Sequence, residues 1–433
     1  MAAGDQGIPF DRMRIALVSE HSSPLAAPGA FDSGSQNLHV AELATALAAL
    51  GHKVAVYTRR NDPHVPQRVQ TSGGYEVVHV TAGPAVRMRG DDVLDHTGDF
   101  VQFLKLAWKA RRPDVIHAHG WLSGIAAVLS ARHTQVPVVQ TFHRVSTTPP
   151  QHHRVNGSTS TRRTAVERLV GHEAARIVAT CEAEARDVLG MGVDRSKLSV
   201  VPRGVDLNLF CPQATRVERL QPRRVVSIGR VMPRKGFEET IRALSTVEGI
   251  ELVIAGGGTQ GDLRDDPETR RLIALAQSVG VVSRLVFAGH LPHAELPVLL
   301  RSADVVVCAP RQWSSGCAAL EAMACGVPVV ATSVGGHTDS VVDGVTGVLV
   351  PSGKADGVAK ALRGLLADST QRTLLGARGQ ERARARYSWH RCAADLVRIY
   401  TAVSGRHAAG NGGKARTSRS TRADGLTPKR DLR

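Results

Sequence analysis

The chain has 433 residues, of which 42% are hydrophobic and 22% charged, which is typical of a globular protein long enough for two domains. No apolar run approaches the roughly 20 residues of a membrane-spanning helix, and the first residues lack the basic and apolar regions of a signal peptide. The six cysteines form no Cys-x-x-Cys pair, which indicates reduced thiols. We therefore expect a cytoplasmic protein.

The net charge of +16 is concentrated partly at the C-terminal end. Residues 406–433 contain eight Lys or Arg and two Asp among many Gly, Ser and Thr, so a disordered basic tail is expected over 405–433. A flexible leader is expected over residues 1–12. A basic tail can contact anionic lipid, which leaves peripheral contact with the inner membrane face open, although such tails are more often simply solvated. No specific nucleic-acid ligand is expected.

Strands and helices alternate from residue 13 to residue 210, where we expect the first domain. The predicted strands are Arg14–Ser19, Val54–Thr58, Val77–Val80, Val115–His117, Val136–Thr141 and Ile177–Thr180. Helices are predicted from about Gln36 to Leu50, over Phe100–Arg111 and over Gly124–Ala131. This alternation is typical of a parallel sheet covered by helices.

A polar, proline-containing stretch after residue 210 marks the expected domain boundary, and the alternation restarts in a second domain over 211–385. The predicted strands there are Val225–Ile228, Glu251–Ala255, Leu285–Phe287, Val305–Cys308, Val327–Ala331 and Gly347–Val350. The predicted helices are Glu238–Leu244, Glu268–Val279, Ala294–Ser302, Cys317–Ala324, Asp356–Leu366 and Trp389–Val403, the last within a separate segment 386–404. The fold class is therefore α/β, with two Rossmann-like doubly wound domains and ligand groups on the strand-to-helix loops.

The stretch from Trp313 to Gly336 predicts a loop, a short helix from about Cys317, a sharp stop and a buried strand. A helix N-terminus preceded by small residues suits a phosphate group. Glu321 lies one turn further along, where its carboxylate could accept hydrogen bonds from ribose hydroxyls. A short buried helix beneath a sheet is the plainer interpretation of this stretch taken alone.

Two further loops are candidates for phosphate binding. Ser227–Gly236 is a strand end, a turn and a helix start that carries Arg230 and Lys235, which could hold a diphosphate in place of a metal. Asp32–Asn37 follows the first strand, and its small residues would allow a ligand to approach a helix N-terminus. For Ser227–Gly236 the alternative is ordinary surface charge, and for Asp32–Asn37 it is an ordinary capped loop.

Histidines end two of the predicted strands, in His117–Ser123 and at His143. A His-x-His pair suggests a metal, but no third ligand has suitable spacing and no Asp-x-Asp motif is present, so no metal site is expected. Gly256–Gly261 matches Gly-x-Gly-x-x-Gly, but it lacks an immediate helix and the acidic residue about 20 positions later, so a dinucleotide site is rejected.

Taken together, these motifs resemble the retaining glycosyltransferases of family 4, which have the GT-B fold. The specific matches are Gly-Arg-x4-Lys-Gly at 229–236, Glu-Ala-Met-Ala-Cys-Gly-Val-Pro-Val-Val-Ala at 321–331, Gly-Val-Asp-x3-Phe at 204–210, and Val-Gly-Gly-x8-Gly-Val-Thr-Gly at 334–347. The likeness covers about Met13 to Val403. The N-terminal region is most similar to bacterial members related to sucrose-phosphate synthase and to the mycothiol and phosphatidylinositol mannoside enzymes.

The resemblance implies an NDP-sugar donor in the second domain, a hydroxyl acceptor in the first, and a final helix that packs back on the first domain. It implies no metal and no cofactor beyond the NDP-sugar co-substrate. His143, Arg230 and Lys235 would be catalytic. The implied donor-binding residues are Gly34, Ser35, Trp313, Gly316, Cys317, Ala318 and Glu321, and the implied acceptor region contains His119 and Arg144.

Three positions depart from the family pattern. The family has Glu-x7-Glu, but Trp313 stands where the first Glu, which normally contacts the donor sugar, is expected. Tryptophan can stack on a sugar face, but it cannot accept hydrogen bonds from sugar hydroxyls. The region Arg144–Arg163 is strongly basic, which suits an anionic or lipid-linked acceptor, and Ser35 replaces a glycine.

The sequence therefore predicts a retaining, metal-independent hexosyltransferase that uses an NDP-sugar. The alternative is a catalytically impaired GT-B protein that binds a nucleotide, a nucleotide-sugar or a partner transferase, and Trp313 is the feature that favours it. A phosphorylase of the same architecture would need a pyridoxal-bearing lysine, and no motif indicates one.

Overall fold

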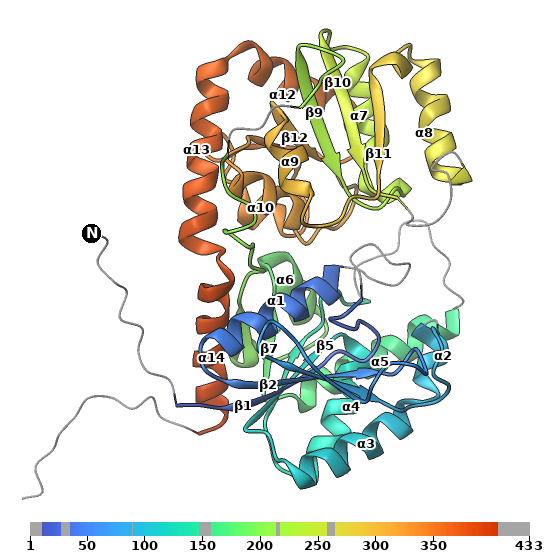
Figure 1. Cartoon of the computed structure of the whole chain (residues 1–433), viewed down its shortest axis with the longest axis vertical. Coiled ribbons are helices and arrows are strands. Elements are labelled where there is room, and N and C mark those ends of the chain that lie inside the picture. The colour runs from blue at the N-terminus through green and yellow to red at the C-terminus, as the bar shows by residue number, and fades with distance from the viewer. Residues whose placement is uncertain are drawn as a thin grey trace, which may run out of the picture.

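The computed structural model describes residues 11–26, 35–88, 90–146, 157–213, 217–257 and 265–405, with only the backbone at 35, 90–91 and 157–160. Two α/β domains lie one above the other, as Figure 1 shows. Gly34, half of the basic region 144–163, most of the expected leader and nearly all of the expected tail lie outside the described residues.

The first domain contains an eight-stranded sheet in the order β3-β4-β2-β1-β5-β6-β7-β8, parallel except for the antiparallel edge strand β3. Its strands are β1 (Arg14–Val18), β2 (Lys53–Arg59), β3 (Arg68–Gln70), β4 (Glu76–Val80), β5 (Val115–His119), β6 (Val138–Thr141), β7 (Arg176–Ala179) and β8 (Leu198–Val200). Its helices are α1 (Ser35–Ala49), α2 (Gly90–Leu94), α3 (Thr97–Ala110), α4 (Trp121–Ala131), α5 (Gly157–Glu173), α6 (Glu182–Gly190) and the 3-10 turn η1 (Arg195–Lys197).

The second domain contains a six-stranded, fully parallel sheet in the order β11-β10-β9-β12-β13-β14. Its strands are β9 (Arg223–Ile228), β10 (Ile250–Ala255), β11 (Leu285–Gly289), β12 (Val305–Cys308), β13 (Val329–Thr332) and β14 (Val348–Val350). Its helices are α7 (Phe237–Leu244), α8 (Pro267–Ser278), α9 (Leu296–Arg301), α10 (Cys317–Ala324), α11 (His337–Ser340), α12 (Ala355–Ala367) and α13 (Ser369–Arg386), with 3-10 turns η2 (Pro233–Lys235) and η4 (Val282–Arg284).

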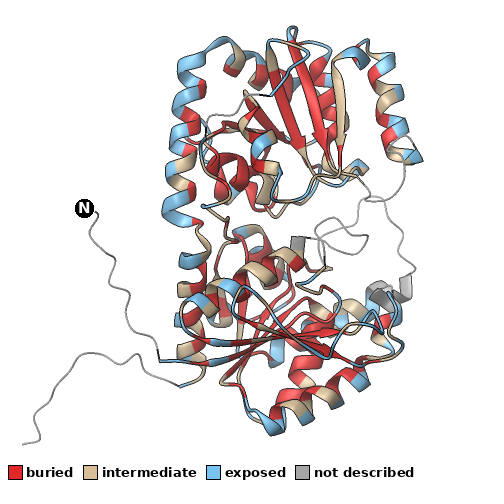
Figure 2. Ribbon diagram, viewed as in Figure 1, coloured by how far each residue is buried: buried red, intermediate tan, exposed pale blue. Residues whose placement is uncertain are grey.

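Helices cover both faces of each sheet, and the buried residues colour the centre of each domain in Figure 2. In the first domain, α3 and α4 bury one face of the sheet and α1 buries the other. In the second, α7 and α12 lie on one face and α10 on the other. Burial on two faces explains why the strands are continuous runs of Val, Ile and Ala rather than alternating patterns.

The last helix, α14 (Trp389–Val403), returns to the first domain. Its residues Cys392, Leu396, Val397 and Tyr400 are buried against α1 in the core of that domain. Burying each large apolar side chain contributes about 1.5–3 kcal/mol, so α14 is an integral part of the first domain. The expectation that the C-terminal helix packs back on the first domain is confirmed.

The chain crosses between the domains at two adjacent places. Val205 donates its N–H to the carbonyl oxygen of Tyr387 at 2.7 Å, just before α14 begins. A side chain at Gly204 would collide with the Trp389 ring, so the two crossings pack closely.

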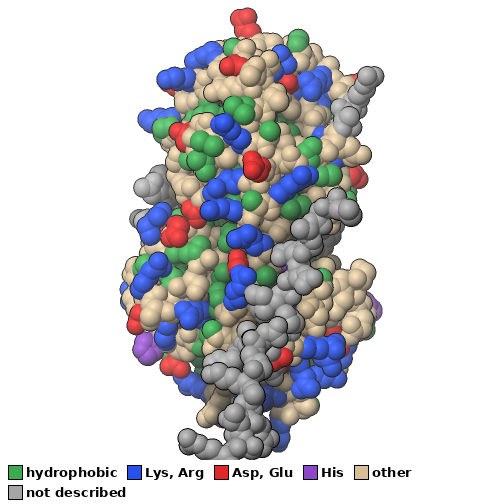
Figure 3. Space-filling view, turned by 90° about the vertical axis from the view of Figure 1, so that its left-hand side faces the viewer, with side chains coloured by type: hydrophobic (Ala, Val, Ile, Leu, Met, Phe, Trp, Pro, Cys, Tyr) green, Lys and Arg blue, Asp and Glu red, His purple; other side chains and the backbone are tan. Residues whose placement is uncertain are grey.

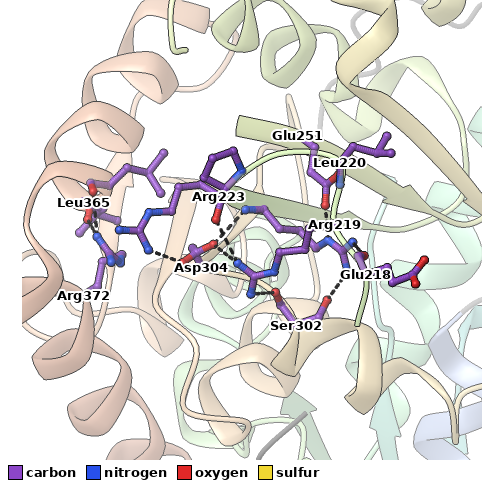
Figure 4. Close-up of polar contacts among 12 residues, drawn as sticks. Glu218, Arg219, Leu220, Arg223, Glu251, Ser302, Asp304, Leu365 and Arg372 are labelled. Atoms are coloured by element: carbon purple, nitrogen blue, oxygen red, sulfur yellow. Dashed lines mark hydrogen bonds and ion pairs between the residues drawn. The ribbon is translucent and has the colours of Figure 1, made fainter. Parts of the chain in front are cut away.

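A polar cluster, buried at Arg224 and Glu251 and more exposed at Arg219 and Arg223, holds the first residues of the second domain, and Figure 4 shows its contacts. Asp304, just before β12, accepts hydrogen bonds from Arg219 at 2.9 Å and Arg223 at 3.1 Å. Arg224 Nε donates to Glu251 Oε1 at 2.6 Å, and both of these side chains are almost fully buried. These contacts fix the linker to the amino ends of β9, β10 and β12.

The predicted α/β class and doubly wound domains are confirmed, and the last helix has the predicted bounds. The sequence prediction missed α13, which has 18 residues, and also β3, α2, α5, α6, β8 and α11. Most of α13 is polar, and its few buried positions include two glycines, so its sequence has no clear apolar stripe.

Lys and Arg side chains are spread over the face formed by α13 and α14 and outnumber the acidic ones there (Figure 3). Within the described ranges, no helix is both long enough and apolar enough to cross a bilayer.

Candidate active site in the interdomain cleft

A cavity of about 450 Å³ opens between the two domains, at the carboxyl ends of both sheets. The first domain contributes residues of the α1 start and of the loop after β6, and the second contributes the loops after β9, β10, β11 and β12. This is the position where open α/β sheets bind their ligands. The lining residues include Gln36, Asn37, Leu38, His143, Arg144, Arg203, Arg230, Arg234, Lys235, His293, Trp313, Cys317, Ala318 and Glu321.

The N-terminus of α10 faces the cavity through Cys317 and Ala318. Gly316 precedes the helix with φ 79°, and Ser314 Oγ accepts the Gly316 N–H at 3.1 Å. The turn at Gly335 lies so close that a Cβ there would be 2.4 Å from the Ser314 carbonyl oxygen. Because glycines rather than larger side chains surround the start of α10, its first backbone N–H groups remain available to an anion.

A second helix N-terminus faces the cavity from the other domain. α1 begins at Ser35, and Gln36, Asn37 and Leu38 in its first turn line the cavity. Gln36 Nε2 donates to the His119 carbonyl oxygen at 3.0 Å, which fixes the first turn of α1 against β5. Two helix N-termini, one from each domain, therefore point their positive ends at the same space.

The turn after β9 presents Arg230, Arg234 and Lys235 to the cavity. Gly236 ends the turn with φ 73°, and a Cβ there would lie 1.7 Å from the Ala309 carbonyl oxygen, so only glycine fits. Burial, and then the charges of Arg234 and Arg230, lower the pKa of Lys235. Three cations therefore lie close together at this turn.

The first domain adds two more cations, Arg144 and Arg203. Burial lowers the pKa of Arg144, and burial with the charges of Arg230 and Arg144 lowers the pKa of Arg234. Among the described residues that line the cavity, Glu321 is the only acid. Five cations and two helix N-termini around one acid constitute a binding site for an anion of several charges.

Glu321 is buried one turn into α10 and is hydrogen-bonded to a residue that sequence reasoning missed. His293 Nε2 lies 3.0 Å from Glu321 Oε1. Burial opposes a charge on His293, but the hydrogen bond to Glu321 and the nearby carboxylates outweigh it and raise the pKa of His293. His293 follows β11, and the rule that strand-to-helix loops line the cleft was the signal that could have identified it.

His143 lines the cavity, with its backbone in the left-handed region at φ 62°. Its Nε2 lies 3.1 Å from Nδ1 of His119, which is fully buried behind it and does not line the cavity. Burial, and then Arg203, lowers the pKa of His119 to about 3, and burial with the neighbouring histidines and Arg203 lowers the pKa of His143. Both rings are therefore neutral near pH 7. The sequence placed His119 in the acceptor region, but the structure gives it a supporting position.

In the sequence, no third ligand had suitable spacing to complete a metal site with the His-x-His pair. His39 of α1 is buried beside His119 and His143, and one ligand atom from each lies within 4.8 Å of the other two. The sequence separation of His39 from the other two hid this proximity. Burial first, and then the positive charge of Arg203, lowers the pKa of His39. The same guanidinium charge would oppose a divalent cation at this cluster.

The structure brings most of the predicted site residues to one cavity. His143, Arg144, Arg230, Lys235, Trp313, Cys317, Ala318 and Glu321 line it, whereas Gly316 caps α10 at its edge and Ser35 is described by its backbone alone. Gly34 lies outside the described residues. The lining residues that were not predicted include Arg203, Arg234 and His293. Arg234 stands inside the motif that predicted Lys235, so its sequence position was available as a signal.

Comparison with known proteins gives two family matches that together span most of the chain. Residues 36–209 match the model of Glycosyltransferase Family 4, and residues 214–382 match that of glycosyl transferases group 1. The chain is 34% identical over 421 residues to a D-inositol 3-phosphate glycosyltransferase of Kineococcus radiotolerans, covering 89% of this chain and 94% of the relative. It is 33% identical over 414 residues to the enzyme of that name in Mycobacterium tuberculosis, covering 92% and 85%.

Solved structures agree with this assignment. A sucrose-phosphate synthase from Thermosynechococcus elongatus superposes with a TM-score of 0.82 at 29% identity, covering 91% of this chain and all of that one. The Anabaena protein HepE in complex with UDP and glucose superposes with a TM-score of 0.69 at 18% identity, covering 90% of this chain and all of that one. The second likeness concerns the fold alone.

Proposed function

Because the chain belongs to glycosyltransferase family 4 and is a glycosyltransferase of GT-B fold, we propose that it transfers a hexosyl group from a nucleoside diphosphate sugar to a hydroxyl acceptor, with retention of anomeric configuration. The observation that carries the proposal is the convergence of Arg144, Arg230, Arg234 and Lys235 on one cavity with two helix N-termini. A diphosphate supplies the charge that this arrangement lacks.

The donor occupies the second-domain side of the cavity in this proposal. Arg230 and Lys235 hold the diphosphate, and the N–H groups of Cys317 and Ala318 donate to its oxygens. Glu321 accepts from the ribose hydroxyls through the oxygen that His293 leaves available. Trp313 stacks on a face of the donor.

The chemistry separates the sugar from a leaving diphosphate. The bond from the anomeric carbon to the diphosphate oxygen breaks, the acceptor oxygen bonds to that carbon, and the acceptor proton passes to a leaving-group oxygen. Cations preorganised around the diphosphate stabilise the charge that develops there, which is commonly the largest catalytic term. Neutral His143 lies between the domains, where it can hydrogen-bond the transferring sugar.

The acceptor binds on the first-domain side and is a phosphorylated or otherwise anionic hydroxyl compound. Arg144 lines that side of the cavity, and Arg163 Nη2 donates to the Arg144 carbonyl oxygen at 3.0 Å. The names of the relatives, a D-inositol 3-phosphate glycosyltransferase and a sucrose-phosphate synthase, support a phosphorylated compound. The basic character of this region also suits a lipid-linked acceptor at the inner membrane face, which is a variant of this proposal.

The reaction needs no metal in this proposal, because side-chain cations, Arg230 and Lys235 first among them, replace the divalent cation that other transferases place on the diphosphate. We also propose a cytoplasmic location, which the six cysteines support, because none of them forms a disulfide and four are buried.

Trp313 was the reason to consider a catalytically impaired protein. That alternative is not favoured, because the relatives found are named as enzymes and the anion-binding residues are retained here. Loss of the usual glutamate removes hydrogen bonds to the donor sugar, which lowers the rate by about 10- to 100-fold if those bonds tighten in the transition state.

The test is a panel of UDP-, GDP- and ADP-sugars, with D-inositol 3-phosphate and hexose phosphates as acceptors and free nucleotide as the readout. We expect one donor to be consumed, more slowly than in the Trp313→Glu variant and equally with or without EDTA. NMR of the product gives the anomeric configuration, which we expect to match the donor.

Lys235→Ala should abolish turnover, whereas Lys354→Ala, at the exposed start of α12, should not change it. Turnover by the Trp313→Glu variant alone would establish the impaired binding protein instead. An inverted product or a loss of activity in EDTA would reject retention or metal independence separately.

A further inference from the structure

A second cavity, of about 630 Å³, lies in the first domain away from the interdomain cleft. Its walls include Arg14, Lys53 and Glu76, the residues at which β1, β2 and β4 begin. The cleft lies at the carboxyl edge of the same sheet, so the two cavities occupy opposite edges of it. The glycosyl-transfer site therefore does not account for this cavity.

The second cavity is strongly basic. Six Lys or Arg side chains line it and only one carboxylate does, and these cations are Arg12, Arg14, Lys53, Arg68, Arg111 and Arg112. The carboxylate, Glu76, is already engaged by Arg68 at 2.8 Å. The wall therefore has a large excess of positive charge, contributed by three strands and by the end of α3.

Three of these cations are exposed and, in the part of the chain that the structure describes, are not engaged in a polar side-chain contact. Among the residues that the structure describes, the side chains of Arg14, Lys53 and Arg111 have no hydrogen-bond or ion-pair partner. Arg112 donates to the Thr134 carbonyl oxygen at 2.8 Å, which orients its guanidinium without neutralising it. Like charges gathered around one hollow repel one another, and a bound anion relieves that repulsion.

His52, on the same wall, adds a buried donor that lacks an acceptor. It is 4% exposed, and its Nδ1 accepts the Met13 N–H at 3.2 Å. Burial lowers the pKa of His52, so the ring is neutral and its proton must be on Nε2. Within the described chain, this Nε2 is buried with no hydrogen-bond partner. Such a donor beside free cations is suited to a ligand oxygen.

We propose that this cavity is a second ligand site, which binds an anion carrying two or more phosphate groups. Its volume lies in the range of small-molecule sites, and its donors are those that recognise phosphate oxygens. Arg14, Lys53 and Arg111 supply the charge, and His52 donates one hydrogen bond from the buried wall. The ligand is either a soluble phosphorylated molecule or the headgroup of an anionic lipid.

The test for the soluble ligand is calorimetric titration with inorganic tripolyphosphate at low and high salt. Because the cleft also binds phosphate, the combined Arg230→Gln and Lys235→Gln variant serves as the background, and it should keep one salt-sensitive site. Adding Arg14→Gln, Lys53→Gln and Arg111→Gln should weaken that site by about 100-fold. His52→Phe alone should weaken it by about 5-fold.

The matched control removes three exposed cations of the second domain, by Lys360→Gln, Arg378→Gln and Arg384→Gln, and should change the affinity less than about 3-fold. Circular dichroism checks that each variant is folded. Equal losses in the control and pocket variants, or no binding in the background protein, would overturn the proposal. None of these outcomes depends on turnover, so they do not bear on the proposed transferase activity.

A parallel sedimentation assay with vesicles of phosphatidylglycerol or phosphatidylcholine identifies the source of the anion. Binding to the phosphatidylglycerol vesicles that the pocket variants abolish would assign the site to a lipid headgroup. Tripolyphosphate binding without such sedimentation would assign it to a soluble ligand. The absence of both would reject the site.

Discussion

The Nδ1 atom of His119 lies 3.1 Å from the Nε2 atom of His143, so a fully buried imidazole stands directly behind the one that lines the cleft. Since burial keeps both rings neutral, one nitrogen of this pair donates and the other accepts. The contact holds the His143 ring in a single orientation, on a backbone that is already in the left-handed region.

We predict that His119→Phe lowers the turnover of the preferred donor by about 10-fold with little change in its KM, because the ring that it removes positions His143 and does not touch substrate. His143→Ala should cost more. The control is His79→Phe, a buried histidine on β4 outside the cleft, which should keep normal turnover. A larger effect on KM than on kcat would contradict a positioning role.

We predict that nucleotide binding weakens as the pH rises above 6.5, because the pKa of His293 is raised by Glu321. Below that raised pKa, His293 is a cation in the cleft, and above it the charge and its ion pair with Glu321 are lost. Calorimetric titration with the preferred nucleoside diphosphate from pH 6 to pH 9 measures the trend. His293→Gln should flatten it, and an unchanged slope in that variant would refute the assignment.

We predict that Glu20→Gln reduces the pH dependence of stability. Burial raises the pKa of Glu20 from 4.5 to about 8, with Arg59 opposing the shift, and neither carboxyl oxygen has a partner within the described residues. Between these two values the unfolded chain has released a proton that the folded chain retains, so stability falls as pH rises through this window. The contribution is on the order of 2–4 kcal/mol.

Urea unfolding at pH 5 and pH 8 tests this. The difference between the two free energies of unfolding should be smaller in Glu20→Gln than in the natural protein, whereas the exposed Glu248→Gln should leave it unchanged. Identical differences in all three proteins would show that Glu20 is not a buried neutral acid.

We predict that Glu251→Gln destabilises the second domain by about 3–5 kcal/mol, because it leaves the buried Arg224 charge without its carboxylate. The matched control is the exposed pair Arg398–Asp395, where Asp395→Asn should change the free energy of unfolding by less than about 1 kcal/mol. Chemical denaturation followed by circular dichroism measures both variants. Equal effects would mean that burial does not amplify the Arg224–Glu251 pair.

The architecture could be predicted because it depends on local patterns. Runs such as Val305–Cys308 are apolar enough to be strands buried on both faces, and Gly326 and Pro328 end α10 in the expected way. Helix α13 was missed because its buried positions include glycines and Arg372, which packs against the end of α12 through hydrogen bonds to the Leu365 and Leu366 carbonyl oxygens. Helix α13 is therefore stabilised by tertiary contacts, which leave no periodic apolar pattern in the sequence.

The candidate site, too, could be predicted only in part. Lys235 and Glu321 lie in short motifs whose neighbours force a turn and a helix start, so their place in the cleft followed from the sequence. The contact between Glu321 and His293 joins the loop after β11 to α10, and that between His39 and His143 joins α1 to the loop after β6. Such contacts depend on how strands are ordered in the sheet, which no local pattern specifies.

The return of α14 to the first domain has a consequence for biosynthesis. The ribosome makes the first 200 residues, with all eight strands of the first sheet, before it makes either the second domain or α14. Until Cys392, Leu396, Val397 and Tyr400 emerge, the groove beside α1 is an uncovered apolar surface on the nascent chain. The domain that is translated first is therefore completed last, so any chain that stops before α14 leaves the ribosome with this groove open to aggregation or to chaperones.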